Sequence, residues 1–236
     1  MPPSLTPPFP PLDPGPSSWD LGALLAAAEP GEDLIAAGGD LDPSTLVDAY
    51  RHGRVPIGLG KHGKGPIGWW SPDPRGVLVP GDLRVRKSLR KVLKRFEIRI
   101  DTAFDEVMAS CGDPQRTRRW ITPEVTAAYR RFHDLGWAHS VETWLGGELV
   151  GGLYGVAIGG LFAGESMFHN VRDASKAALV GLVELIAADG DERRLIDVQR
   201  RTDHLASLGV NEVGRADYLA ALGRALQAPP VDFRGT

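Results

Sequence analysis

Three consecutive segments in the second half of the chain have the two-residue period of β-strands. Two glycine pairs, Gly146-Gly147 and Gly159-Gly160, separate them. Such pairs are typical of tight hairpin turns, because the central turn residues need a positive φ. The sequence therefore predicts an antiparallel meander with strands at 138–145, 148–158 and 161–168.

Helical signals flank this meander on both sides. Before it, Thr122 is an expected N-cap residue, and Pro123 begins a helix that ends at Gly136. Further helices are expected at 103–111, 173–189, 202–208 and 215–226, and further strands at 97–104 and 193–199. The sequence thus predicts an α+β fold with a mostly antiparallel central sheet.

The first 82 residues differ in character from the rest. Residues 1–18 contain eight prolines, which remove backbone donors and favour an extended chain, so this segment is expected to be a tail or a wrapping arm. A helix that begins at Pro43 and strands within 67–80 predict a small N-terminal domain at 19–82. A larger domain is expected at 83–236.

Composition narrows the class of protein. The net charge is −3, so binding to nucleic acid requires a local basic patch. The single cysteine, Cys111, excludes a disulfide framework and a cysteine zinc site, and the six histidines show no metal-ligand spacing. No apolar run is long enough to span a membrane, and the N-terminus has no signal-peptide features. The sequence predicts a cytoplasmic protein with no cofactor, metal or membrane partner.

One carboxylate stands within a strand that otherwise looks buried. Strict alternation places Glu165 on the same face as Leu161, Ala163 and Met167, with Phe162 on the other face. A buried carboxylate is costly unless it is paired. Glu165 is therefore either a structural ion-pair or strand-end group, or a group that recognises a cationic or amine substrate.

Two more polar residues lie on the strand expected at 193–199. Asp197 and Gln199 share one face of it, and Ile196 and Val198 point the other way. Two polar groups on one face of an internal strand indicate a cleft. A strand with one solvated face has the same pattern.

The segment 84-RVRKSLRKVLKR-95 contains seven basic residues and no acidic residue. Its apolar residues recur at helical spacing, which predicts an amphipathic helix with a basic outer face. Such a face is either merely solvated or binds phosphate groups, because counterion release favours phosphate binding. The residues expected to contact RNA phosphates are Lys87, Arg90, Lys91, Lys94 and Arg95.

Other candidate groups give weaker signals. Trp69, Trp70 and Trp120 can stack on bases, but tryptophan more often packs in a core or a domain interface. His139 and Ser140 point to opposite faces of their strand, and the sequence contains no Gly-x-Ser-x-Gly turn, so no nucleophilic triad is expected.

Several segments, taken together and in order, resemble one family. They include LIAAGGDLDPSTLVDAYRHG, WWSPDPRGVLVP, RRWITPEVTAAY, LFAGESMFHN and DASKAAL. Over roughly residues 32–225 the chain resembles the leucyl/phenylalanyl-tRNA–protein transferases. The resemblance implies a small N-terminal domain and an acetyltransferase-like (GNAT-type) catalytic domain. It also implies transfer of Leu or Phe from aminoacyl-tRNA to the N-terminal amine of proteins that begin with Arg or Lys, which marks those proteins for degradation.

The resemblance also implies roles for particular residues. Glu165, Asp197 and Gln199 match the family's catalytic cleft, and Trp120 matches the tryptophan of its Trp-Ile-Thr motif. The residues that match an apolar pocket for the transferred amino acid are Leu153, Phe162, Met167, Leu179, Leu182 and Ile196.

The chain departs from the family pattern at two places. Val55-Pro56-Ile57-Gly58 stands where the family usually has Phe-Pro-Trp-Phe, so a ring expected to stack on the terminal adenine of the tRNA is missing. Val198 stands where the family usually has a cysteine between Asp197 and Gln199. The second change is expected to be harmless, because the side chain of Val198 faces away from those two residues.

Two other functions remain open on the sequence alone. An N-acetyltransferase that uses acetyl-CoA would have a glycine-rich pyrophosphate loop, but the corresponding junction, 168-FHNVRDASKAAL-179, contains no glycine. A non-catalytic tRNA-binding protein would keep the basic helix and would not need Asp197 or Gln199. For the transferase, the proton of the attacking amine passes either to the protein or to the ribose hydroxyl of the substrate.

Overall fold

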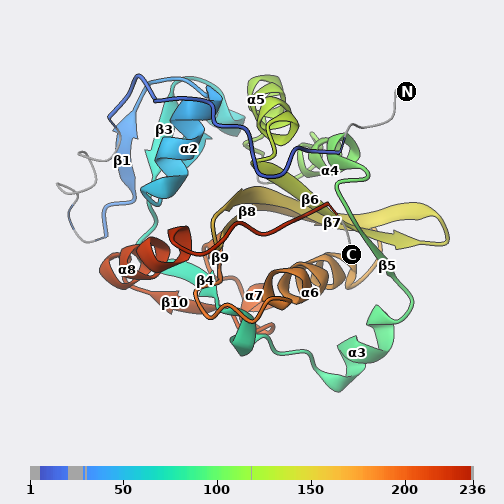
Figure 1. Ribbon diagram of the computed structural model, residues 1–236. Coiled ribbons are helices and arrows are strands. Elements are labelled where there is room, and N and C mark those ends of the chain that lie inside the picture. Colours follow the sequence, from blue (N-terminus) through green and yellow to red (C-terminus); the bar gives the residue numbers. More distant parts are fainter. Residues whose placement is uncertain (1–5, 21–28, 30, 118, 235–236) are drawn as a thin grey trace.

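The computed structural model describes residues 6–20, 29, 31–117 and 119–234. Within them the strands form two sheets (Figure 1). The smaller sheet has the order β1-β3-β2, and the larger has the order β10-β4-β9-β8-β7-β6-β5. Residues 1–5 of the expected proline-rich tail lie outside the described residues.

The small sheet is built from the N-terminal segment. β1 (Leu34–Ala37) and β2 (Val55–Gly58) both pair antiparallel with β3 (Ile67–Trp70). The connecting helix α2 (Pro43–Arg51) begins at the expected proline, where a missing N–H costs no helical hydrogen bond. After the helix, Gly53 has a φ of 69°, and a Cβ at this position would lie 2.8 Å from the Tyr218 ring. The end of α2 is therefore in close contact with the C-terminal part of the chain.

The large sheet contains the expected meander. β6 (Ala138–Leu145), β7 (Glu148–Ile158) and β8 (Leu161–His169) pair antiparallel in chain order, which confirms the three strands. β5 (Glu97–Ile100) pairs antiparallel with β6, and β9 (Leu195–Gln199) pairs parallel with β8. The prediction of an α+β fold with a mostly antiparallel central sheet is confirmed.

β4 (Arg75–Leu78) belongs to a different sheet from the one that the sequence suggests. It lies in the large sheet, between β9 and β10 (Asn211–Val213), although residues up to 82 are expected in the small N-terminal domain. The chain therefore passes from the small sheet to the large sheet between Trp70 and Arg75. Strand periodicity identifies a strand but not its partner. The division of the chain into domains at residue 82 stays a prediction.

Helices cover both faces of the large sheet (Figure 1). α4 (Phe104–Cys111) and α5 (Pro123–Asp134) lie on one face, in a hydrophobic cluster that also contains α2. α6 (Ala174–Ala187) lies on the other face in a second cluster. The remaining helices of the described residues are α3 (Lys87–Leu93), α7 (Asp203–Ala206) and α8 (Arg215–Leu226), with short 3-10 turns at Lys61–Gly63 and Pro80–Asp82.

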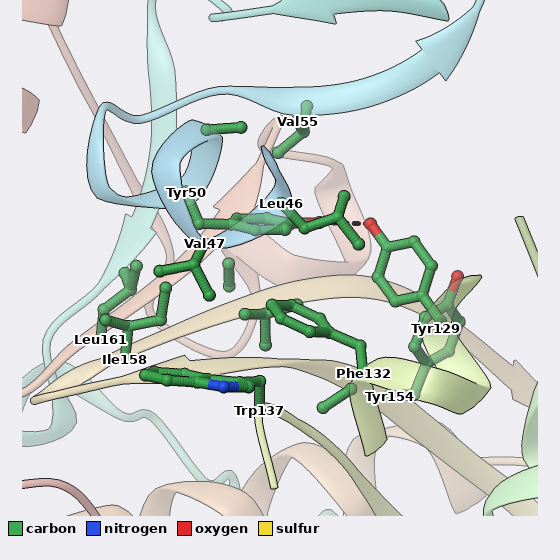
Figure 2. Packing of buried hydrophobic residues seen from close by; sticks show 14 of the residues in the cluster. Leu46, Val47, Tyr50, Val55, Tyr129, Phe132, Trp137, Tyr154, Ile158 and Leu161 are labelled. Carbon is green, nitrogen blue, oxygen red and sulfur yellow. Dashed lines mark hydrogen bonds between the residues drawn. The ribbon is translucent and has the colours of Figure 1, made fainter. Parts of the chain in front are cut away.

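One hydrophobic core joins the N-terminal segment to the large sheet (Figure 2). Leu46 and Tyr50 of α2, Tyr129 and Phe132 of α5, and Tyr154 of β7 are each at most 2% exposed. The hydroxyl groups of Tyr50 and Tyr129 are hydrogen-bonded to each other. This core fixes the position of α2 relative to α5 and β7.

Part of the proline-rich segment lies along the chain that follows α5. The N–H of Leu12 donates to the carbonyl oxygen of Leu135 at 2.9 Å, and the Trp137 indole donates to the carbonyl oxygen of Leu12 at 2.8 Å. At Leu12 the segment is therefore an arm bound to the surface at the end of α5.

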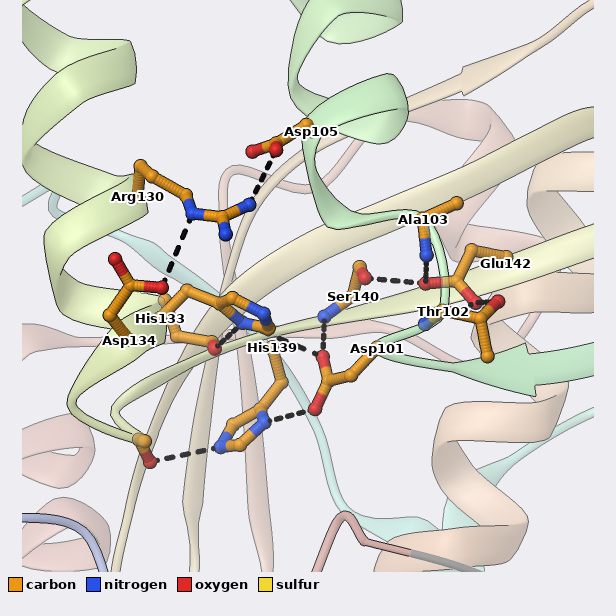
Figure 3. Close-up of polar contacts among 12 residues, drawn as sticks. Asp101, Thr102, Ala103, Asp105, Arg130, His133, Asp134, His139, Ser140 and Glu142 are labelled. Atoms are coloured by element: carbon orange, nitrogen blue, oxygen red, sulfur yellow. Dashed lines mark hydrogen bonds and ion pairs between the residues drawn. The ribbon is translucent and has the colours of Figure 1, made fainter. Parts of the chain in front are cut away.

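A buried polar network ties β6 to the turn before α4 (Figure 3). Asp101 accepts hydrogen bonds from His139 Nδ1 at 2.7 Å and from the backbone N–H of Ser140 at 2.8 Å. Glu142 accepts from the hydroxyls of Ser140 and Thr102. Burial raises the pKa of Glu142 to about 7. His139 and Ser140 thus hold a carboxylate in place as part of the scaffold.

Candidate active site

The site lies where β8 and β9 separate. The two strands pair in parallel at their N-terminal ends, and beyond that point β8 contains a β-bulge. Gly155 of β7 pairs with Gly164 and its neighbour Tyr154 pairs with Ser166, so Glu165 is the extra residue of β8. A bulge breaks the regular alternation and gives the extra side chain a new direction.

The bulge corrects one expectation from the sequence. Strict alternation puts Met167 on the face of Leu161 and opposite Phe162. In the structure Leu161 and Ala163 pack in the cluster of α4 and α5, whereas Phe162 and Met167 both pack in the cluster of α6. The reason is that one additional residue reverses the facing of every later residue in a strand.

Glu165 is held between hydroxyl and amide donors. The Tyr129 hydroxyl donates to Oε2 at 3.2 Å, and the side-chain amide of Gln199 donates to Oε1 at 3.2 Å. Burial raises the pKa of Glu165 to about 7, and the hydrogen bonds of Tyr50 and Tyr129 oppose that shift. The carboxyl group is therefore divided between its neutral and ionised forms near neutral pH.

Asp197 is fully buried, at 0% exposure, whereas the strand pattern predicts an open cleft on its face. Arg75 Nε donates to Oδ1 at 2.9 Å, and Arg75 Nη2 donates to Oδ2 at 2.6 Å. The Tyr218 hydroxyl also donates to Oδ2, at 2.8 Å. Oδ1 accepts a further hydrogen bond from the backbone N–H of Gln199 at 2.8 Å. In this arrangement Asp197 reaches the site only through Gln199.

Gln199 ends β9 in a left-handed backbone conformation, with a φ of 63°. Residues other than glycine seldom adopt this conformation, and the hydrogen bond to Asp197 holds the backbone there. The side-chain amide donates to the carbonyl oxygen of Gly164 at 3.3 Å as well as to Glu165. Gln199 and Glu165 are both half-buried, whereas Asp197 is fully buried. Gln199 and Glu165 are therefore the two residues that a substrate can reach.

An apolar cavity of about 130 Å³ opens beside Glu165, between β8, β9, α6 and α7. All six residues expected in an apolar pocket line it: Leu153, Phe162, Met167, Leu179, Leu182 and Ile196. The wall also contains Val198, Leu205 and the consecutive β8 residues Gly164, Glu165 and Ser166. Val198 does face away from Asp197 and Gln199, as expected. The replacement at this position nevertheless changes the surface of the cavity.

Trp120 is not part of this cavity. It is half-buried and packs against the core shared with α2. Its backbone lies against the turn at Gly63, where a Cβ would be 2.2 Å from the Trp120 carbonyl oxygen. Next to it, Arg119 Nη2 lies 2.8 Å from His62 Nε2. Trp120 therefore lies at the contact between the Lys61–Gly63 turn and the segment before α5.

The two other tryptophans have structural contacts. The Trp69 indole donates to the carbonyl oxygen of Gly38 at 2.9 Å, and Trp69 is 1% exposed. The Trp70 indole donates to the carbonyl oxygen of Ile57 at 3.0 Å. Ile57 itself is a half-buried residue of β2. These contacts hold β1, β2 and β3 together.

The basic helix forms over a shorter range than expected, as α3 at Lys87–Leu93. Leu89 is buried against the α6 cluster. The five cations expected to contact RNA are all exposed: Lys87, Arg90, Lys91, Lys94 and Arg95. None of them takes part in an ion pair within the described residues. α3 lies on the α6 side of the sheet (Figure 1). The apolar cavity is lined by α6 residues and so lies on the same side.

Sequence reasoning missed four residues that support the site. Tyr50 and Tyr129 are hydrogen-bonded to each other and to Glu165. Arg75 and Tyr218 donate hydrogen bonds to Asp197. The sequence does contain a signal for Arg75, because this residue is the only charge in the otherwise apolar strand RGVL. A charge in such a strand requires a buried partner. The sequence contains no such signal for the three tyrosines, because a tyrosine on an apolar helix face is indistinguishable from an ordinary core residue.

Other reactive groups lie elsewhere. Cys111 is buried, and burial raises the pKa of its thiol to about 11. No group of three or more His, Cys, Asp and Glu side chains among the described residues is arranged to hold a metal ion. None of the helices in the described part of the chain is long and apolar enough to cross a membrane.

Comparison with known proteins identifies the family. Among solved structures, the chain is similar to a GCN5-related N-acetyltransferase from Kribbella flavida, with a TM-score of 0.37 and 13% identity over 73% of this chain and 61% of that chain. The leucyl/phenylalanyl-tRNA–protein transferase of Azoarcus sp. is 50% identical over 86% of this chain and 87% of the relative. That of Burkholderia thailandensis is 47% identical over 95% of this chain and 88% of the relative. The sequence model of the family described as leucyl/phenylalanyl-tRNA protein transferase matches residues 77–223. The chain belongs to the leucyl/phenylalanyl-tRNA–protein transferase family of acyltransferases.

Proposed function

We propose that this chain transfers leucine or phenylalanine from aminoacyl-tRNA to the N-terminal amine of proteins that begin with Arg or Lys, and so marks them for degradation in the cytoplasm. The apolar cavity beside Glu165 carries the proposal. This cavity is lined by aliphatic and aromatic side chains, and its wall also contains Glu165 and Ser166. A cavity of this kind suits an apolar side chain whose ester group lies next to polar residues.

The reaction exchanges an ester for an amide. The α-amine nitrogen attacks the ester carbonyl carbon, a C–N bond forms, and the C–O bond to the ribose breaks. The tRNA leaves with a free terminal hydroxyl group, which takes up the proton that the amine loses. The exchange runs downhill, so the barrier is lowered by alignment, proton transfer and stabilisation of the oxyanion.

Glu165 suits the proton-transfer step. An α-amine has a pKa near 8, and a general base works best when its own pKa is close to the working pH. Burial raises the pKa of Glu165 to about 7. In the proposed mechanism its ionised form accepts a hydrogen bond from the incoming ammonium group and takes one proton from it, which leaves the neutral amine that attacks. The second proton, lost after the attack, is the one that the ribose oxygen takes up.

Gln199 and Asp197 have different roles in this proposal. The side-chain amide of Gln199 lies 3.2 Å from Glu165 Oε1, close enough for both groups to contact one amine. Asp197 does not touch the substrate; it is a positioning residue that holds the Gln199 backbone at 2.8 Å. Trp120 is proposed to contact the substrate from the side of the Lys61–Gly63 turn, and the cations of α3 are proposed to bind tRNA phosphates.

The proposal is tested by offering two donors with one acceptor. The protein is incubated with a peptide that begins with Arg and with either leucyl-tRNA or acetyl-CoA. We expect leucylated peptide and no acetylated peptide. Acetylation would identify an acetyltransferase, and tRNA binding without any transfer would identify a non-catalytic binding protein. Peptides that begin with Lys and with Glu test the acceptor preference, and only the former is expected to react.

A further inference from the structure

A second cavity, larger than the apolar one, lies between α3, the loop that joins β8 to α6, and α7. Its volume is about 430 Å³. We call it the basic cavity, because five cations line it: Arg84, Arg86, Arg95, Arg172 and Lys176. The segment 84–95 supplies three of them, and the other two come from the N-terminal end of α6 and the loop before it.

The positive charge of the basic cavity is only partly balanced. Asp173 is the one acidic residue among the described residues that line it, and it lies 3.0 Å from Lys176 Nζ and 3.6 Å from Arg172 Nε. Arg84, Arg86 and Arg95 have no acidic partner among the described residues. Cations that line one space repel one another, and an anion placed between them removes that repulsion.

The chemistry of the walls selects phosphate groups. The cavity offers arginine guanidinium groups, which bind phosphate oxygens in pairs, and the hydroxyls of Ser88 and Ser207. Its apolar lining is aliphatic, including Leu89 and Val92, and no aromatic ring is present among the described residues that line it. A base would need such a ring for stacking. The site is therefore suited to the backbone of a nucleic acid and not to its bases.

The basic cavity and the apolar cavity share two walls. On α6, Lys176 lines the first and Leu179 the second, three residues further along. Residues at this spacing lie on the same helix face, about 5 Å apart. On α7 and the turn after it, Leu205 lines the apolar cavity and Ser207 the basic one. A ligand in the basic cavity thus lies next to the transferred amino acid.

We propose that the basic cavity binds the phosphate groups of the last nucleotides of aminoacyl-tRNA, next to the esterified adenosine. This inference rests on the proposed transfer from aminoacyl-tRNA. It assigns the contact to the cations that line the basic cavity, including Arg84, Arg86, Arg172 and Lys176, which are not among the five cations expected from the sequence to contact RNA. Lys87, Arg90, Lys91 and Lys94 do not line the cavity.

The test compares leucyl donors with and without those phosphates. Leucyl-adenosine has no phosphate, whereas a leucylated trinucleotide with the tRNA end sequence and leucyl-tRNA carry them. KM for each donor is measured with wild type and with Arg84→Gln/Arg86→Gln. The matched control is Arg51→Gln/Arg224→Gln, which removes the same charge from exposed residues outside the cavity.

We expect the cavity variant to raise KM for the trinucleotide and for leucyl-tRNA by on the order of 5- to 25-fold at about 0.1 M salt, the effect of losing one to two phosphate contacts. KM for leucyl-adenosine, and all values of the control variant, should match wild type. KM values in the cavity variant that equal those of wild type for the trinucleotide and for leucyl-tRNA would overturn the proposal, and so would a rise of the same size for leucyl-adenosine. If wild type transfers leucine from no donor, the proposed function itself fails, which is a separate outcome.

Discussion

Arg75 and Asp197 form a two-point ion pair in the interior, although they lie 122 residues apart in the chain. Both side chains are 1% exposed. Arg75 also donates to the carbonyl oxygen of Gly53 at 3.1 Å, and its guanidinium lies 4.4 Å from the centre of the Tyr218 ring. The pair therefore connects β4 and β9 with α8 and the end of α2, directly behind Gln199.

Removal of the carboxylate should destabilise the fold. Asp197→Ala leaves the Arg75 guanidinium buried and unpaired, which costs about 3–5 kcal/mol. Tyr218→Phe removes one hydrogen bond from the same carboxylate and should cost about 1–2 kcal/mol. Urea unfolding of the two variants and wild type measures both values. An Asp197→Ala protein as stable as wild type would show that the ion pair does not support the fold.

Substitution of Gln199 should slow transfer without unfolding the protein. We expect at least a tenfold lower single-turnover rate for Gln199→Ala, because the amide that faces Glu165 is lost. Gln199→Gly is the matched control: it also removes the amide, but it relieves the left-handed backbone, worth about 1 kcal/mol. The two variants should be equally slow, with Gln199→Gly the more stable. A wild-type rate in either would remove Gln199 from the mechanism.

Glu165 should make stability depend on pH in a defined window. Burial raises its pKa from 4.5 to about 7 in the folded protein, so the folded state binds the proton more tightly than the unfolded state. The associated stability is fully present below pH 4.5 and is lost as pH rises to about 7, by at most about 3 kcal/mol.

The Glu165→Gln variant isolates this effect. Glu142 also has a pKa raised to about 7 by burial, and it titrates in both proteins. The free energy of unfolding of wild type minus that of Glu165→Gln should therefore fall between pH 4.5 and pH 7 and stay constant above. If the difference in the free energy of unfolding does not change between pH 4.5 and pH 7, the pKa of Glu165 is not raised in the folded protein.

The apolar cavity should set the preference among donors. Leucine buries about three more carbons than alanine, at about 0.8 kcal/mol each. Transfer of leucine should therefore exceed transfer of alanine by on the order of 10- to 100-fold when both are attached to the same tRNA. Val198→Phe should abolish this advantage, because the larger ring fills a cavity of about 130 Å³. Equal rates for the two amino acids in wild type would place the side-chain pocket elsewhere.

The sequence was most informative where local chemistry decides the structure. The glycine pairs predict the β6-β7-β8 meander, and Pro123 marks the start of α5, because turn and cap geometry depend on adjacent residues. The family resemblance, and not periodicity, selected the six residues that line the apolar cavity. Alternation placed Phe162 and Met167 on opposite faces, because a bulge has no reliable signature in a single sequence.

Long-range pairing was beyond the reach of the sequence. That β4 joins the large sheet, and that Arg75 meets Asp197, follow from which strands become neighbours. The burial of Asp197 follows from the same pairing. A polar residue on a strand face gives the same sequence pattern whether it borders a cleft or binds a buried partner behind the site.

Mass spectrometry of the acceptor peptide tests the central claim most directly. Wild-type protein and Gln199→Ala are each incubated with leucyl-tRNA and a peptide that begins with Arg. The same peptide with an acetylated N-terminus serves as the blocked control. We expect wild type to add one leucine residue to the N-terminus of the free peptide, Gln199→Ala to do so at least tenfold more slowly, and the blocked peptide to stay unchanged. A free peptide that gains no leucine, or a blocked peptide that gains one, would contradict the assignment of this chain as an N-terminal aminoacyltransferase.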